Sequence, residues 1–293
     1  MKRAVKAMYG LWLAAAVAVV AIGLTVAATS IQAHRGTEPQ VLQHLADIPS
    51  DAWGRLSERT IFFGHRSVGR DIMDGIGDLA ADHGAMNLRI VETKDPNGIT
   101  GPGLAHALIG RNLDPESKII EFTRVMESGL GEKVDIAFFK FCFVDFGQTS
   151  NPEAIFTSYC NAMDSLNARF PRVTFMHVTV PLCGPAKKAK GMLKASVKRL
   201  IGRPPVLAEN LVRSRYNALL RERFSGKEPL FDLALYESTD LEGLQHYGLR
   251  SGQEVPLLVC SYTDDGGHLN ATGRRHVAEQ LLIQLANLPG GVP

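Results

Sequence analysis

The sequence lacks the features that mark several classes of protein. It has four cysteines in 293 residues, no C-x-x-C pair, and no cysteine–histidine spacing typical of a zinc site. The formal net charge is only +2, so there is no general excess of positive charge to attract a polyanion. There is no internal repeat. We therefore expect no metal, no cofactor and no nucleic-acid partner.

The N-terminal segment combines basic residues with a long apolar run. Lys2, Arg3 and Lys6 precede an almost unbroken apolar run from Leu11 to Ala28. This run is about long enough to span a bilayer, and longer than the usual signal-peptide core of roughly 7–15 residues. We expect residues 1–33 to be a signal peptide or an uncleaved signal-anchor, with slight preference for the anchor. Either would place the remaining chain outside the cytoplasm, periplasmic or extracellular, and cleavage would make it a secreted protein.

The chain after the N-terminal segment alternates between short apolar runs and amphipathic stretches. We expect residues 34–59 to form a linker with a short helix, and residues 60–293 to form one α/β domain. The alternation predicts a parallel sheet covered by helices on both faces. The expected strands are Thr60–Phe63, Leu88–Glu92, Val134–Val144, Val173–Val180 and Leu230–Tyr236; the expected helices are Val68–His83, Pro115–Ser128, Pro152–Phe170, Leu207–Phe224 and one that Asn270 or Thr272 caps. Lys94–Gly110, rich in glycine and proline, is predicted to be an ordered loop.

A carboxylate and an imidazole lie close together near the C-terminus, in Asp264-Asp265-Gly-Gly-His268. The two glycines allow a tight loop that places Asp265 and His268 on one side. A carboxylate that fixes the tautomer of a neutral histidine is half of a device that activates a nucleophile. Asp264 is the alternative partner of the histidine. A helix-capping loop without chemistry is the simpler interpretation of an isolated D-x-x-H.

The missing nucleophile is expected after the first strand. Ligands bind beyond the carboxyl ends of parallel strands, and the turn Gly64–Gly69 lies at that edge. Ser67 is then placed at a helix N-terminus, where backbone amides favour a developing oxyanion. Ser67, His268 and Asp265 are thus the candidate catalytic residues. The alternative is that Ser67 caps the helix that begins near Val68.

These residues carry a resemblance to a known family. A serine after the first strand, an acidic residue at the end of the third, and D-x-x-H-x-N before the last helix resemble a divergent SGNH (GDSL-like) hydrolase. The resemblance implies a three-layer α/β/α sandwich with a flavodoxin-like parallel sheet. It also implies ester hydrolysis or acyl transfer without a metal, often at acetyl groups on carbohydrates. On the substrate and oxyanion side the candidate residues are His65, Gly69, Lys140, Asp145 and Asn270.

The chain departs from the family pattern at two places. Gly-Asp-Ser of the family is here Gly64-His65-Arg66-Ser67, so Ser67 matches only with one residue inserted. The asparagine that donates to the oxyanion in the family corresponds to Val144. His65 or Lys140 could replace that donor, and Gly69 or a glycine of Gly98–Gly103 could supply the glycine amide. Asp145 has a structural alternative, in which it holds loops in place.

The function and part of the surface each admit more than one interpretation. We favour an extracytoplasmic serine esterase; an O-acyltransferase, or an impaired relative that binds an acylated or anionic glycan, is the alternative.

The segment Cys183–Arg203 is basic and amphipathic, and is a lid, a contact for anionic lipid headgroups, or a solvated face. Lys140 inside an apolar strand requires a partner such as Asp145 or Asp135. Cys183 and Cys260 are the first pair to test for a disulfide.

Overall fold

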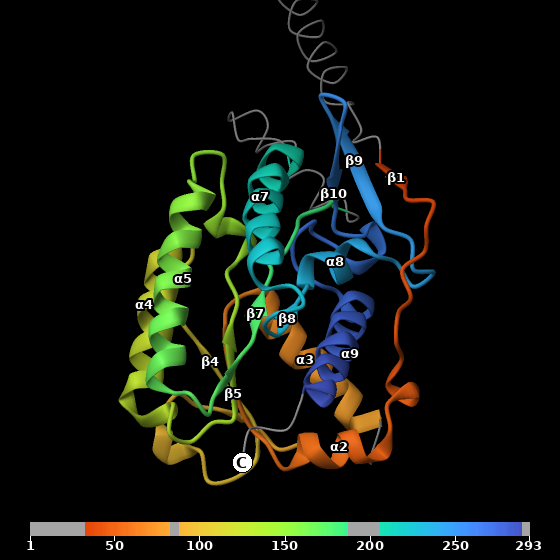
Figure 1. The fold of residues 1–293 in the computed structure, drawn as a ribbon. Coiled ribbons are helices and arrows are strands. Elements are labelled where there is room, and N and C mark those ends of the chain that lie inside the picture. The colour runs from red at the N-terminus through yellow and green to blue at the C-terminus, as the bar shows by residue number, and fades with distance from the viewer. Residues whose placement is uncertain (1–32, 83–87, 187–205, 289–293) are drawn as a thin grey trace, which may run out of the picture. The chain divides into compact units, whose positions relative to one another are not determined.

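The computed structural model describes residues 33–82, 88–186 and 206–288, and every structural statement below concerns these residues (Figure 1). None of their helices is both long and apolar enough to cross a membrane. The expected signal or anchor falls, except for its last residue, outside the described residues. So do residues 187–205, which make up most of the expected basic helix.

A parallel sheet forms the centre of the domain. Its five strands lie in the order β3-β4-β2-β5-β6, and every pairing between them is parallel. Beyond β6 the chain passes Met176 into β7, which pairs in parallel with β8. The strands are β2 (Thr60–His65), β3 (Ile90–Glu92), β4 (Gly103–Leu108), β5 (Ile136–Phe139), β6 (Thr174–Phe175), β7 (His177–Val178) and β8 (Leu230–Phe231). The predicted parallel α/β class is confirmed.

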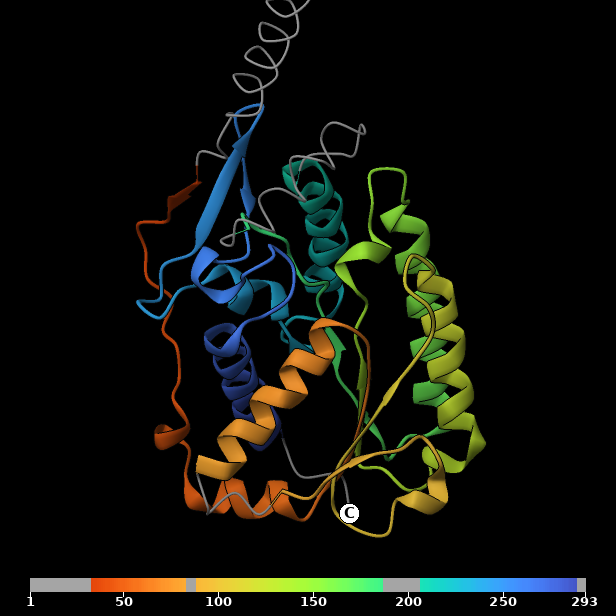
Figure 2. The same cartoon turned by 180° about the vertical axis from the view of Figure 1, so that it is seen from behind.

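Helices cover both faces of this sheet, because successive strand residues point to opposite sides. Ile61 and Phe63 of β2 join one apolar core, and Phe62 between them joins the other. The first core packs against α2 (Ser50–Ser57), α3 (Val68–Asp82), α8 (Leu233–Ser238) and α9 (Ala271–Asn287). The second packs against α4 (Pro115–Val125), α5 (Pro152–Arg169) and α7 (Val206–Phe224). The two views show these groups on opposite sides of the strands, as in a three-layer sandwich (Figures 1 and 2).

Short elements complete the domain. A small antiparallel sheet joins β1 (Ala33–Arg35), β9 (His246–Arg250) and β10 (Gln253–Pro256). Single turns are formed by η1 (Leu45–Asp47), η2 (Pro96–Gly98), η4 (Phe143–Asp145) and η5 (Cys260–Tyr262), and α4 continues into the π-helical turn η3 (Met126–Leu130). The segment expected to be a linker therefore contains β1, η1 and α2.

The prediction of a loop over 94–110 is wrong for its second half. Gly103–Leu108 is β4, which lies between β2 and β3 and hydrogen-bonds to both. The run is short, interrupted by His106 and bordered by glycine, so its strand character comes from two neighbours that the local sequence does not reveal. Gly103 is required there, because a Cβ would lie 2.4 Å from the carbonyl oxygen of Arg89.

Four of the five predicted strands are longer than the observed ones: the second begins only at Ile90, and the fourth is divided into β6 and β7, which belong to different sheets. The third ends at Phe139, because the chain then turns towards η4. The fifth is two residues long and is followed at once by α8, whose N-cap is Asp232. The predicted helices agree with the structure to within a few residues, and Asn270 is confirmed as the N-cap of α9.

The order of the strands determines where loops meet. From β2 the chain passes through α3 to β3 and β4 on one side, and then returns to β5 on the other side of β2. The carboxyl ends of β2 and β5 therefore flank the point where the connections change direction. In open α/β sheets ligands bind at this point. Ser67 follows β2 and Phe143 follows β5, so both lie there.

Candidate active site

Ser67 occupies a sharp turn between β2 and α3. Its backbone has φ 54°, in the left-handed region that non-glycine residues rarely adopt. Such a conformation costs on the order of 1–3 kcal/mol and occurs mostly at functional sites. The Ser67 carbonyl accepts a 2.6 Å hydrogen bond from Arg70 and so begins the helix. The hydroxyl bonds to a histidine instead of capping α3, which sets aside the capping alternative.

Three side chains form a hydrogen-bonded chain at this turn. Ser67 Oγ lies 2.7 Å from His268 Nε2, and His268 Nδ1 lies 2.8 Å from Asp265 Oδ2. The arrangement assigns the Nδ1 proton to the bond with Asp265, which leaves Nε2 free to accept the Ser67 proton. Ser67, His268 and Asp265 therefore lie together through these two hydrogen bonds, and Asp265 is the carboxylate that bonds Nδ1.

Hydrogen bonds between the Asp265 side chain and backbone amides hold the loop that carries Asp265 and His268. Asp265 Oδ1 accepts from the amides of Gly267 at 2.9 Å and of His268 at 2.8 Å. Burial acts to raise the pKa of Asp265, but these bonds and the bond from the imidazole outweigh it and lower the pKa to about 2. Gly266 has φ 88°, and a Cβ there would lie 2.7 Å from Gly184 O. The turn therefore requires glycine at position 266.

Phe143 borders the histidine on the side of β5. Its ring meets the His268 ring edge-on, with centroids 5.7 Å apart. A Cβ on Gly267 would lie 2.8 Å from the Phe143 ring, so this contact depends on that glycine. No motif in the sequence singles out Phe143. It fell inside the predicted strand Val134–Val144, and only the end of β5 at Phe139 places it in the loop at the site.

Backbone amides at the start of α3 are the available oxyanion donors. Within the described residues, the N–H groups of Ser67 and Val68 have no hydrogen-bond partner. They stand at the N-terminus of a 15-residue helix, whose dipole favours negative charge. Val144 supplies no side-chain donor, as the sequence predicts.

The glycines considered for the oxyanion are not in a position to serve. Gly69 N donates to Arg66 O at 3.0 Å. Its role is steric, because a Cβ at Gly69 would lie 2.3 Å from His65 Cβ. Gly98–Gly103 lies at the opposite edge of the sheet, where Gly103 pairs with Thr60. Gly110, after β4, is nearer, but its amide is bound to Glu121 Oε2 at 2.7 Å.

His65 faces away from the site. Its side chain is fully buried, and its Nε2 lies 3.0 Å from His106 Nδ1. Burial, followed by the charges of His106 and Lys140, lowers the pKa of His65 to about 2, so the ring is neutral. Its second nitrogen is buried without a partner among the described residues. The structure does not support His65 as an oxyanion donor.

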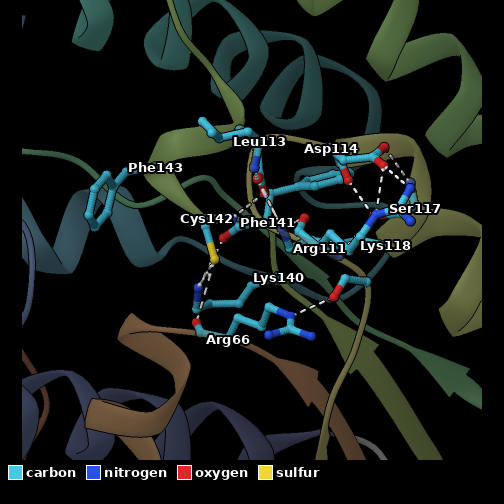
Figure 3. A network of polar contacts seen from close by, with 12 residues as sticks. Arg66, Arg111, Leu113, Asp114, Ser117, Lys118, Lys140, Phe141, Cys142 and Phe143 are labelled. Carbon is cyan, nitrogen blue, oxygen red and sulfur yellow. Dashed lines mark hydrogen bonds and ion pairs between the residues drawn. The ribbon is translucent and has the colours of Figure 1, made fainter.

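Lys140 does not reach a substrate either, because its side chain is wholly buried. Nζ donates to Phe141 O at 3.0 Å and lies 3.8 Å from Cys142 Sγ (Figure 3). Neither expected partner is used, since Asp135 accepts from the Thr60 amide and Asp145 binds another lysine. No carboxylate of the described residues lies within ion-pair distance of Lys140.

Asp145 belongs to a buried network that holds the loops after β4 and β5. Lys118 Nζ lies 2.7 and 2.9 Å from its two oxygens, and both side chains are 0% exposed. Asp145 also accepts from the amides of Leu113 at 2.9 Å and Cys142 at 2.7 Å. This is the loop-holding alternative, and the carboxylate has no contact with Ser67 or His268.

Asn270 is likewise fully engaged. Its Oδ1 accepts from the amides of Thr272 and Gly273, and its Nδ2 donates to Ser261 O. It therefore caps α9, and none of these bonds joins it to Ser67, His268 or Asp265. None of the four cysteines, all of which lie in the described residues, forms a disulfide, so Cys183 and Cys260 are not bonded to each other.

A separate cavity of about 420 Å³ lies beside α3 and contains none of the three converging residues. Its walls come from α3, β3, β4 and α9, and the lining residues are Arg70, Met73, Asp74, Gly77, Asp78, Ile90, His106 and Arg274. No cluster of three or more histidine, cysteine or carboxylate side chains suited to a metal occurs in the described parts of the chain.

Comparison with known proteins gives matches among solved structures alone. No family model and no curated protein matches the sequence. The chain is similar to a platelet activating factor protein from Streptococcus pneumonia (13% identity, 82% of this chain, 94% of that one, TM-score 0.45). It is also similar to the periplasmic domain of a lipopolysaccharide acetyltransferase from Salmonella ser. Paratyphi A (10%, 79% and 86%, 0.41). A third is a family 3 carbohydrate esterase from Talaromyces cellulolyticus (16%, 78% and 96%, 0.40). With TM-scores below 0.5, functional assignment depends on the side-chain geometry.

Proposed function

We propose that this protein is a serine esterase or acyltransferase of the SGNH type. One observation carries the proposal: Ser67 Oγ, His268 Nε2–Nδ1 and Asp265 Oδ2 are joined by bonds of 2.7 and 2.8 Å. Such an arrangement activates a hydroxyl for attack on an acyl carbon. The strand order, with β4 and β5 flanking β2 and β6 beyond β5, is consistent with the flavodoxin-like sheet that the sequence resemblance implies.

The reaction begins when Ser67 Oγ attacks the ester carbonyl and His268 Nε2 takes its proton. The carbonyl oxygen becomes an oxyanion, which accepts from the amides of Ser67 and Val68. Collapse of this intermediate breaks the ester bond, and the alcohol leaves with the proton from His268. Asp265 keeps its negative charge throughout and stabilises the imidazolium. Water then resolves the acyl-enzyme in hydrolysis, or another hydroxyl group resolves it in transfer.

The substrate we propose is an acyl ester of a carbohydrate, as the resemblance of the sequence implies. We further propose that the domain acts outside the cytoplasm. The motive is the position of Lys2, Arg3 and Lys6 before the apolar run. A reporter fused after Thr37 should be active outside the cytoplasm, and complete protease resistance of the domain in intact spheroplasts would contradict this.

Labelling with a fluorophosphonate tests the chemistry. The wild-type protein should be labelled at Ser67, and hydrolysis of an aryl acetate should be lost in Ser67→Ala and in His268→Ala. The double variant should be little worse than either single, because the residues act as one unit. Ser57→Ala is the matched control, since its hydroxyl bonds only to Gly54 O on α2. Wild-type activity equal to that of Ser67→Ala would refute the enzyme and leave the glycan-binding alternative.

A further inference from the structure

Asp71 connects the helix that follows Ser67 with the loop that carries His268. It lies in the first turn of α3, four residues after Ser67, so both are on the same side of the helix. Its Oδ2 accepts a 3.0 Å hydrogen bond from the backbone N–H of Leu269. Leu269 is the residue directly after His268, so this bond fixes the backbone at the histidine.

The rest of the loop is held by hydrogen bonds within itself and by one to Gly184. Asp265 Oδ1 closes the loop on itself, and Gly266 O accepts from Gly184 N at 3.0 Å. Thr263 and Leu269 form a bridge within the loop. In the described residues, the Asp71 bond is the one side-chain hydrogen bond between this loop and α3. Apart from it, the Ser67–His268 bond itself joins the loop to the turn before the helix.

The Asp71 carboxylate, which anchors the loop through the Leu269 amide, is partly removed from solvent. The side chain is half-buried, and burial is the main cause that raises the pKa of Asp71. His268 and Lys140 oppose this rise, while Asp74 supports it. The buried Glu237 also lies within electrostatic reach. Leaving a partly desolvated acceptor without its donor costs more free energy than leaving a solvated one without its donor. The bond between Asp71 and the Leu269 amide therefore favours the observed position of the loop.

We propose that Asp71 is a positioning residue for the Ser67–His268 pair: its carboxylate holds the Leu269 amide, and thereby keeps the His268 ring within reach of Ser67 Oγ. The inference rests on the proposed function. It assigns no contact with the substrate to Asp71. Loss of the anchor should therefore affect the rate of acyl transfer much more than the binding of substrate.

Three substitutions separate the effect of the hydrogen bond to Leu269 from the effect of the carboxylate charge. Asp71→Ala removes both, Asp71→Asn retains an acceptor of the same shape without the charge, and Asp71→Glu retains the charge but displaces the acceptor. We expect Asp71→Ala to lower kcat by about 10–100-fold with KM within twofold, because a misplacement near 1 Å can cost about 100-fold. Asp71→Asn should remain within about threefold of wild type, and Asp71→Glu should lose about tenfold.

Asp74→Asn is the matched control. Asp74 is an exposed carboxylate on the same helix, lines the separate cavity and makes no hydrogen bond to the loop. Its substitution should leave kcat unchanged. Urea unfolding of each variant shows whether the protein is folded, and Asp71→Glu decides the matter if Asp71→Ala is not.

Two kinetic results would overturn the inference. One is an Asp71→Ala or Asp71→Glu enzyme whose kcat is within twofold of wild type. The other is an Asp71→Asn enzyme as impaired as Asp71→Ala, since the charge would then matter and the anchor would not.

Failure of the proposed function has a different signature, because the wild type itself would resist the fluorophosphonate. In that case the positioning role of Asp71 is tested by the proton NMR signal of His268 Nδ1–H, which donates to Asp265. It should be sharp in wild type and Asp71→Asn and broadened in Asp71→Ala. An equally sharp signal in Asp71→Ala would reject the positioning role.

Discussion

Replacement of Lys118 by methionine should destabilise the domain severely. Lys118 and Asp145 are both fully buried, and Lys118 Nζ contacts both carboxylate oxygens and Arg111 O. Methionine fills similar space but leaves the carboxylate without a countercharge. Removal of one partner of a buried ion pair costs about 3–5 kcal/mol, against a total stability of about 5–15 kcal/mol for a typical domain.

The same change should reach the site, because Asp145 holds the amides of Leu113 and Cys142 and belongs to the turn that contains Phe143. Displacement of Phe143 loosens the packing on His268. We therefore expect slower labelling of Ser67 as well as lower stability. Urea unfolding gives the free energy, and the rate of fluorophosphonate labelling gives the effect on the site.

Two further variants make this prediction specific. Lys94→Met removes a lysine whose 2.6 Å ion pair with Glu121 is 51% exposed on the lysine side, and should cost at most about 1 kcal/mol. Lys118→Met combined with Asp145→Asn removes both buried charges and should recover part of the loss. A Lys118→Met protein within about 1 kcal/mol of wild type, or a double variant clearly worse than the single, would refute the reasoning.

The remaining predictions concern single sites. Gly69→Ala should cost about 1–3 kcal/mol in unfolding free energy through overpacking against His65 Cβ, and added His65→Ala should not restore the loss, because alanine keeps that Cβ; unchanged stability in Gly69→Ala would show that the helix adjusts freely. Burial raises the pKa of Glu237 to about 8, so stability is full below about pH 4.5 and falls as pH rises through 8. Glu237→Gln should flatten that fall in urea unfolding at pH 5, 7 and 8.5, whereas parallel curves would contradict the burial argument. Asp265→Asn should lower kcat/KM by at least about 100-fold, because the asparagine no longer fixes the tautomer of His268; with the pKa of Asp265 at about 2, no loss from its protonation should appear above pH 4 in the wild type.

The local sequence predicted the parts of the fold that repeat a short pattern. Helices such as α5 and α9 have an apolar stripe together with an N-cap, Asn151 or Asn270, so their limits follow from nearby residues. The strand β4 has no such signal. It becomes a strand because β2 and β3 supply hydrogen bonds on both sides. For the same reason the local sequence does not place the loop of Gly110 at the carboxyl edge of the sheet.

For the site, the sequence by itself determined the reacting groups and their order along the chain. D-x-x-H with two glycines limits how far Asp265 can lie from His268, and the apolar run before Ser67 predicts a strand that ends at a helix. Tertiary structure alone decided which polar side chains serve the site. Whether Asp145 or His65 faces a substrate depends on distant partners: Asp145 binds Lys118, 27 residues away, and His65 lies beside His106, 41 residues away. Lys140 and Asn270 are likewise directed by bonds that form only in the folded chain. Hydrogen bonds and burial between distant segments are not encoded in any short pattern, and for this reason Asp71 and Phe143 became visible only in the folded chain.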